Sequence, residues 1–128
     1  MIETAIYTLL TESAGLTALV NDRIQHHVLG NDATYPALTY FVPADTPDQP
    51  ITGASYTNRA LIQVDVWSED SLEAGLVAAE VISALRNYKG TKSGVRVLLI
   101  RFEEQSSDYE QTTQHYRRTI ELTAYYEG

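Results

Sequence analysis

Two segments of the chain alternate apolar and polar side chains, and this pattern constrains the fold more than any other. In residues 60–67 the apolar face carries Ala60, Ile62, Val64 and Val66. In residues 116–126 it carries Ile120, Leu122 and Ala124. Strict alternation is typical of strands that bury one face and expose the other. We therefore expect a sheet whose apolar face is covered by other elements.

The strongest helical pattern covers residues 71–89. Asp70 can cap the start of this helix, Glu73 completes a capping-box pattern, and Gly90 can end it. The polar positions form one stripe, namely Glu73, Glu80, Ser83 and Asn87. The apolar positions lie opposite, namely Leu72, Leu76, Ala79, Ile82 and Leu85. We expect the apolar stripe to pack on the sheet.

Shorter patterns supply the remaining elements. Residues 3–10 predict an N-terminal helix with Ile6, Leu9 and Leu10 on one face. The other expected elements are a helical turn at 16–20 and strands at 24–29, 38–42 and 95–102. This order predicts an α+β fold, with an antiparallel or mixed sheet of about four strands and the main and N-terminal helices on one face. The length of 128 residues is that of a single domain, 1–128.

The segment 43–57 interrupts these elements. It holds Pro43, Pro47, Pro50 and Gly53, which indicates a long polar loop or a loose hairpin. We expect it to be mobile in the free protein and ordered against a partner.

Apolar positions of the helix and strands should form one core where helix meets sheet. The residues expected to be mostly buried are Val64, Val66, Leu76, Ile82, Leu98, Ile100 and Leu122.

Composition narrows the function. The net charge is −8, from 17 acidic and 9 basic residues, and such a chain repels phosphate, which argues against tight nucleic-acid binding through a broad basic face. The absence of cysteine excludes disulfides and thiolate metal sites. The chain shows neither a signal-peptide pattern nor an apolar run of membrane-spanning length. We expect a protein of the cytoplasm, or of a particle assembled there.

No catalytic, cofactor or metal site is predicted. The three histidines, His26, His27 and His115, lack the spacing of known metal sites, and neighbours on a strand point to opposite faces. The acid pairs Glu69–Asp70 and Glu103–Glu104 fit a helix start and a strand end that runs into a polar turn. Ser55 lacks the second glycine of a nucleophile elbow.

Asp65 is the most informative single acid, because it lies between Val64 and Val66 on the face that carries Trp67. It is either a partly buried carboxylate paired with an arginine such as Arg117, or a solvated residue of the outer face. Nine tyrosines have a similar double interpretation. They suit a protein interface, and they equally suit ordinary strands.

Three segments carry a resemblance to a known family: residues 16–24 (Leu-Thr-Ala-Leu-Val-Asn-Asp-Arg-Ile), 35–40 (Tyr-Pro-Ala-Leu-Thr-Tyr) and 64–68 (Val-Asp-Val-Trp-Ser). With the helices beside them, they resemble the tail-completion, or tail-terminator, proteins of long-tailed phages and prophages. The resemblance implies an α+β subunit of a hexameric ring at the head-proximal end of the tail tube, which ends tube growth and allows head–tail joining. It implies no catalysis, no cofactor and no membrane. Its partners would be other copies of itself, the tail tube protein and head–tail connector proteins, with DNA only passing through.

Two other functions remain open at this stage. One is a small ligand-binding or enzymatic α+β domain, and the other is a different head–tail connector component.

Charged residues are segregated along the chain and are the candidate subunit interface. The basic stretch comprises Arg86, Lys89, Lys92 and Arg96. The acidic stretch comprises Glu103, Glu104, Asp108 and Glu110. In a head-to-tail ring the basic stretch of one subunit would face the acids of the next, while the remaining acidic surface would line the channel. The simpler interpretation is that both stretches are solvated turns.

Overall fold

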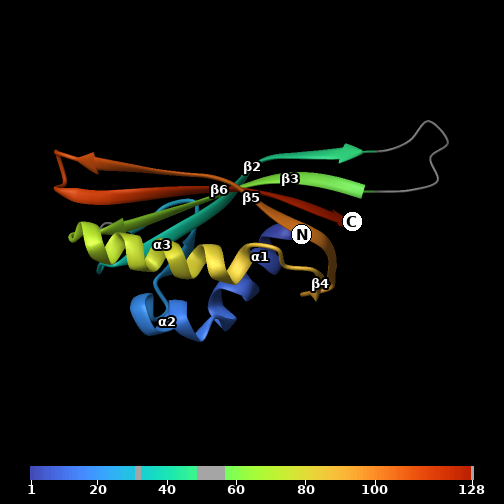
Figure 1. Ribbon diagram of the computed structural model, residues 1–128, viewed down its shortest axis with the longest axis horizontal. Helices are drawn as coiled ribbons and strands as arrows, with labels where there is room; N and C mark the ends of the chain where they lie inside the picture. The colour runs from blue at the N-terminus through green and yellow to red at the C-terminus, as the bar shows by residue number, and fades with distance from the viewer. Residues whose placement is uncertain (31–32, 49–56, 128) are drawn as a thin grey trace.

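The computed structural model describes residues 1–30, 33–48 and 57–127 (Figure 1). The helices are α1 (Ile2–Glu12), α2 (Ala14–Val20) and α3 (Ser71–Leu85). The strands are β1 (Ile24–His26), β2 (Ala37–Asp48), β3 (Thr57–Ser68), β4 (Gly90–Lys92), β5 (Val95–Glu110) and β6 (His115–Glu127).

The strands form one mixed sheet in the order β1-β2-β3-β6-β5-β4. Strand β1 runs parallel to β2, and all other neighbours are antiparallel. The α+β class and the mixed sheet are confirmed, but the described sheet has six strands rather than about four. The unpredicted strand is β4, whose three residues are too few to show alternation.

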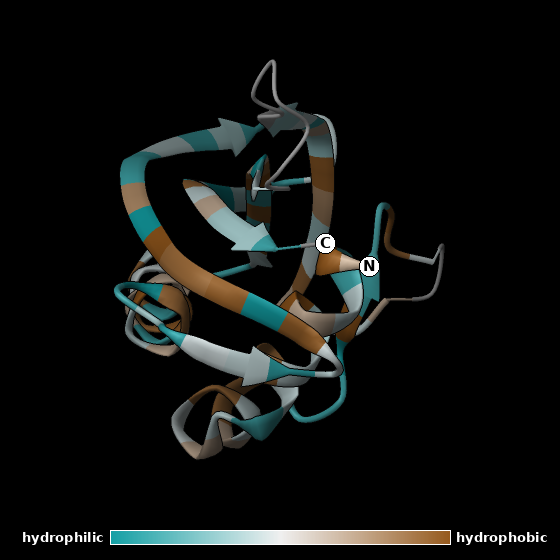
Figure 2. Ribbon diagram, turned by 90° about the vertical axis from the view of Figure 1, so that its right-hand side faces the viewer, coloured by the Kyte–Doolittle hydropathy of each residue, from teal (hydrophilic) through white to brown (hydrophobic). Residues whose placement is uncertain are grey.

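The helices cover one face of this curled sheet, and no helix of the described residues lies on the other face (Figures 1 and 2). In Figure 2 hydrophobic and hydrophilic bands alternate along the long strands. The hydrophobic positions of β3 and β6 point to the helices and are buried, among them Ile62, Val64, Ile120 and Leu122. The main core prediction for the sheet is therefore confirmed, except that Leu98 is only half-buried because it lies where the β5–β6 register shifts.

The predicted face of α3 was wrong in its first half, although Leu85 at its end is buried as predicted. Leu72 and Leu76 are 79% and 61% exposed, and Ala79 is exposed as well. The buried residues are Ala74, Val77, Ala78, Val81 and Leu85, while Ile82 is half-buried. The small side chains allow the helix to lie close to the sheet. The polar stripe misled the prediction because Glu73 and Glu80 are themselves half-buried.

The start of α3 was predicted correctly from the sequence, whereas its end was not. The Asp70 cap is confirmed, since its carboxylate accepts a hydrogen bond from the Leu72 N–H at 3.2 Å. Glu73 instead accepts a hydrogen bond from the Ser68 hydroxyl at 2.8 Å. The helix ends at Leu85 and not near Gly90. Asn87 takes a φ of 64°, and its N–H donates to the Ile100 carbonyl at 2.8 Å, so pairing with β5 replaces the last expected turn.

Two long hairpins extend toward opposite ends of the molecule (Figure 1). Strands β2 and β3 form the loose hairpin that was one of the two expectations for residues 43–57. Residues 49–56 lie outside the described residues, so ordering of this segment on assembly stays a prediction. Strands β5 and β6 form the other hairpin. Strand β5 runs to Glu110, so Glu103 and Glu104 lie within a strand and not at its end.

A partly buried hydrogen bond ties the two hairpins together. The Tyr126 hydroxyl of β6 donates to the Asp45 carboxylate of β2. Tyr126 is buried, and burial followed by this hydrogen bond raises the pKa of its hydroxyl well above the ordinary value of 10.0. The folded protein therefore holds this proton more tightly than the unfolded chain does.

The observed orientation of α3 predicts different losses of stability when Ile100 and Leu76 are each shortened to alanine. Ile100→Ala should lower the free energy of unfolding by about 2–5 kcal/mol, because it opens a cavity in the core. Leu76→Ala should change it by less than about 0.5 kcal/mol, because that side chain is in water. Denaturant unfolding of both variants measures this. Similar losses at the two positions would contradict the assigned helix face.

The Tyr126 contact predicts a loss of stability in alkali. The unfolded tyrosine ionises near its ordinary pKa of 10.0, so the stabilisation is complete below that pH and is lost as the pH rises through the higher folded pKa. Tyr126→Phe should lower stability at neutral pH by about 1–2 kcal/mol and flatten the alkaline decline. Tyr109→Phe is the control, because Tyr109 is 42% exposed. An unchanged alkaline slope in Tyr126→Phe would contradict this role.

Candidate functional site

The outer parts of the two charged stretches lie toward opposite ends of the long axis (Figure 1). The basic stretch spans the end of α3, β4 and the start of β5. Asp108 and Glu110 lie at the far end of β5, beside the tip of the β5–β6 hairpin (Figure 1). The fold thus separates the ends of the two stretches, whereas Glu103 and Glu104 lie in the middle of β5, next to Phe102, whose ring the Arg86 guanidinium approaches.

Half of the basic stretch already has partners within the chain. Lys92 Nζ lies 2.8 Å from a Glu12 carboxylate oxygen, and this hydrogen bond raises the pKa of the lysine. Arg96 pairs with Glu127 at 3.2 Å. The Arg86 guanidinium lies 5.6 Å from the ring centre of Phe102. Among the described residues, neither Arg86 nor Lys89 has an acidic partner within 4.0 Å, and both are exposed.

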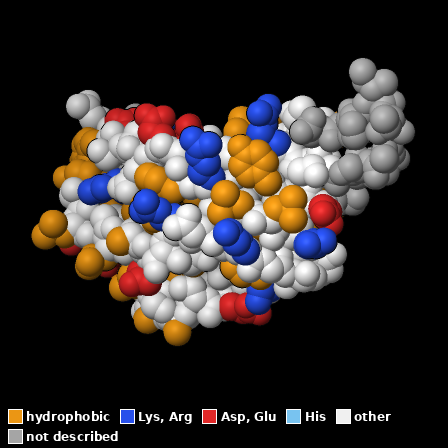
Figure 3. All heavy atoms as spheres, turned by 45° about the vertical axis from the view of Figure 1, so that its right-hand side comes forward, with side chains coloured by type: hydrophobic (Ala, Val, Ile, Leu, Met, Phe, Trp, Pro, Cys, Tyr) orange, Lys and Arg blue, Asp and Glu red, His pale blue; other side chains and the backbone are white. Residues whose placement is uncertain are grey.

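Half of the acidic stretch likewise has ionic partners within the chain. Glu103 lies 3.3 Å from Arg101, and Asp108 lies 3.5 Å from Arg117. Glu104 and Glu110 are exposed and have no basic partner within 4.0 Å in the described part of the chain. On the side shown in Figure 3, Lys and Arg side chains spread over the centre, and acidic side chains lie mainly at the margins.

An open cavity of about 430 Å³ lies on the helix-free side, between the β1–β2 connection and the β5–β6 hairpin tip. Its lining includes Asp65 and Trp67 of β3, Tyr35 of the connection, and Glu110 and His115 of the hairpin. Asp65 is only 7% exposed and accepts hydrogen bonds from the Thr119 hydroxyl at 2.7 Å and from the Gln63 amide at 3.1 Å.

The first interpretation of Asp65 is correct for its burial and wrong for its arginine partner, and the second is wrong. The residue is buried rather than solvated, and no arginine pairs with it among the described residues. Arg117 instead lies over the Trp67 ring, 5.4 Å from its centre. The Trp67 indole N–H is buried and has no hydrogen-bond partner in the described part of the chain.

The histidines lie near this cavity without forming a metal site. Strand β1 ends at His26, and His27 takes a φ of 71°, which brings the two ring centres within 4.2 Å instead of on opposite faces. The His115 ring lies 4.1 Å from that of Tyr35. Within residues 1–30, 33–48 and 57–127, no three His, Asp or Glu side chains are placed to hold a metal ion.

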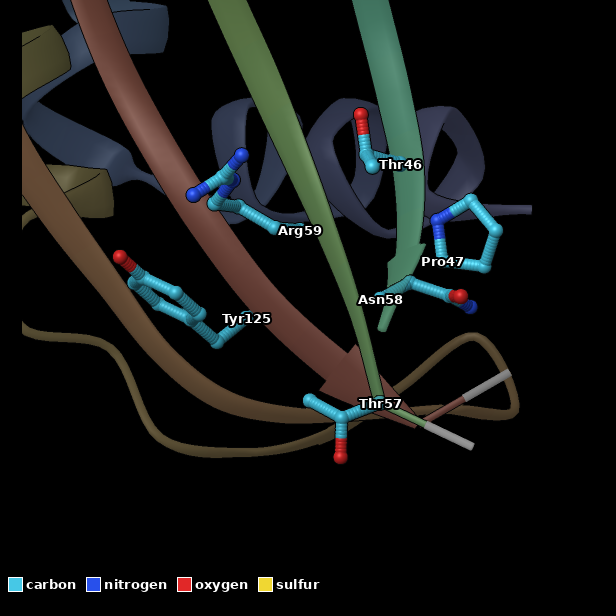
Figure 4. A pocket seen from close by; sticks show the side chains of 6 residues that line it. All are labelled: Thr46, Pro47, Thr57, Asn58, Arg59 and Tyr125. Atoms are coloured by element: carbon cyan, nitrogen blue, oxygen red, sulfur yellow. The ribbon is translucent and has the colours of Figure 1, made fainter. Parts of the chain in front are cut away.

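A second, smaller cavity of about 200 Å³ lies on the β2–β3 hairpin. Arg59 and Tyr125 lie opposite each other on β3 and β6 and point to one side of the sheet, whereas Asn58 points to the other (Figure 4). This lining brings together no acid–base pair. Ser55 lies outside the described residues, and Asp70 is a helix cap, as expected.

The tyrosines divide between core and surface. Tyr40 and Tyr126 are buried in the core. Tyr109 and Tyr116 pack against each other at the β5–β6 hairpin, with ring centres 4.8 Å apart and the rings tilted by 53°. Tyr7 and Tyr109 are more than 40% exposed, so both are available to an interface. No helix in the described part of the chain has the length and apolar character needed to cross a membrane.

Comparison with known proteins agrees with the fold. A family model described as tail completion protein gp17 matches residues 4–127. A chain in the solved structure of the virion of a native gene transfer agent particle has the same fold. The TM-score is 0.81 at 18% sequence identity, over 99% of this chain and 95% of the other. No curated protein sequence matches the chain. Because the family match extends over almost the whole sequence, the chain belongs to the tail completion protein gp17 family, whose members are structural proteins of phage tails.

Proposed function

We propose that the chain forms a hexameric ring at the head-proximal end of the phage tail tube. The family match over residues 4–127 carries this proposal. The fold that it shares with a chain of a gene transfer agent virion supports it, because that chain is part of a virion. In this role the ring stops growth of the tube and presents the face that joins the head. Its partners are neighbouring copies, the tail tube protein and head–tail connector proteins.

The separation of charge supports a head-to-tail contact. A cyclic ring joins two different patches of each subunit, so patches of opposite charge must lie apart on the same chain. The basic stretch and the end of the acidic stretch meet this requirement (Figure 1). Arg86 and Lys89 on one subunit, and Glu104 and Glu110 on the next, are the charges left without ionic partners among the described residues. They set register and encounter rate more than affinity.

The net charge of −8 suits the passage of DNA. Acidic surface that is not used between subunits would line the channel and repel the phosphate backbone. DNA would then be cargo and not a bound ligand.

Charge reversal tests the subunit contact. Arg86→Glu combined with Lys89→Glu should weaken self-association about tenfold or more, because it places acids against acids. Adding Glu103→Lys and Glu104→Lys to the same chain should restore part of it. Mass measurement across a concentration series, with and without tail tubes, gives the readout.

The neutral variant Arg86→Gln with Lys89→Gln is the matched control, and its association should fall between wild type and reversal. All effects should shrink as salt rises, since the charges are exposed. Normal association of the reversal variant across a range of salt would exclude the charged contact while leaving the ring itself possible.

Tube growth tests the position in the tail. Purified protein added to polymerising tail tube protein should stop elongation, and negative-stain images should show it at one tube end. A ring elsewhere on the tail, with normal tube lengths, would favour another head–tail component.

A further inference from the structure

We propose that the cavity around Asp65 and Trp67 receives a cationic side chain of a second copy of this chain, supplied by its basic stretch. The proposal rests on the ring described above and adds a specific contact to it. We call the cavity around Asp65 and Trp67 the socket.

The first step is the chemistry of the cavity floor. Asp65 is 7% exposed, and its hydrogen bonds come from neutral groups, the Thr119 hydroxyl and the Gln63 amide. Buried carboxylates are normally paired with a cation, because neutral donors offset only part of the loss of hydration. No Lys, Arg or His lies within 4.0 Å of Asp65 among the described residues. The carboxylate is therefore oriented and partly desolvated before any cation arrives.

The second step is the cavity wall. The rings of Trp67, Tyr35 and His115 line it, and the carboxylate of Glu110 lies on the same lining. Aromatic faces attract cations, and the lining itself contains no lysine or arginine. Arg117 already lies over the Trp67 ring, 5.4 Å from its centre. The carboxylates of Asp65 and Glu110 are therefore the main attraction for a second cation. The cavity volume of about 430 Å³ is in the range of pockets that hold small organic ligands, so a long side chain fits. A guanidinium or ammonium group on a flexible stem matches this combination.

The third step identifies the donor. The cavity lies beside the β5–β6 hairpin tip, at the end of the molecule away from β4 (Figure 1). In a head-to-tail contact, the basic end of the next subunit approaches this end. Lys92 and Arg96 are held by Glu12 and Glu127 of their own chain. Arg86 and Lys89 remain, since both are exposed and without an acidic partner within 4.0 Å among the described residues.

The experiment uses Asp65→Asn, which keeps the shape and removes the charge. Asp22→Asn is the matched control, because it makes the same chemical change at an exposed acid outside the cavity. Self-association is followed by mass measurement, alone and with tail tubes. Asp65→Asn should weaken it about tenfold or more, whereas Asp22→Asn should leave it unchanged. Thermal unfolding of the free subunits checks that both variants are folded.

Trp67 provides an independent reading, because it is the only tryptophan in the chain. Its fluorescence is excited at a wavelength where tyrosine does not absorb. Acrylamide should quench this fluorescence less strongly when the wild-type protein assembles. Two double variants combine Asp65→Asn with Arg86→Met or with Lys89→Met. If one of these cations enters the cavity, its double variant should associate no more weakly than Asp65→Asn alone, because Asp65→Asn has already removed that contact.

Two results separate this inference from the ring. If wild-type protein assembles but Asp65→Asn assembles equally well, or Trp67 stays equally accessible, the socket is wrong and the ring stands. If wild-type protein does not associate even on tail tubes, the ring proposal fails and the socket fails with it.

Discussion

The pairing of β3 with β6 at the centre of the sheet is the constraint on which the rest of the structure depends. The two strands are in register over the whole of β3, from Thr57 opposite Glu127 to Ser68 opposite Tyr116. Because side chains alternate along both strands, this register places Val64 and Ile120 on the same face. The helices must cover that face, since leaving it in water would forfeit most of the hydrophobic stabilisation. The opposite face is thereby left free for Asp65 and Trp67.

The sequence revealed this central pair because both strands alternate apolar residues on the helix side with mostly polar residues on the other side. It did not reveal the far half of β5, where the residues from Glu103 to Glu110 are half-buried or exposed and so lack an apolar alternation. There the strand is held by pairing with β6 and not by burial. The end of α3 was missed for a related reason, since the Asn87 backbone pairs with Ile100, and no side-chain pattern reports such a bond.

The α3 face shows how a correct periodicity can give the wrong orientation. Two stripes on this helix could have faced the sheet, one rich in leucine and one rich in alanine and valine. The second was chosen because Ala74 and Ala78 let the helix lie close to the strands, which leaves Leu72 and Leu76 in water. The candidate site follows the same rule. The charged stretches could be found from sequence, whereas the cavity could not, because Tyr35, Asp65 and Glu110 come together only through the sheet register and the hairpin.

The position of the acids on β5 has a second consequence for assembly. Strand β4 covers β5 only from Val95 to Val97, so within the described residues the far half of β5 has no strand on its outer side. An open edge of this length can pair with any other exposed strand, and charged side chains are a common protection against such pairing. Glu104 and Glu110 thus discourage unspecific contacts along the strand. The same charges favour a partner that presents cations, as the basic stretch does. One set of side chains can therefore reject incorrect neighbours and orient the correct one, as the proposed ring of identical acidic subunits would require.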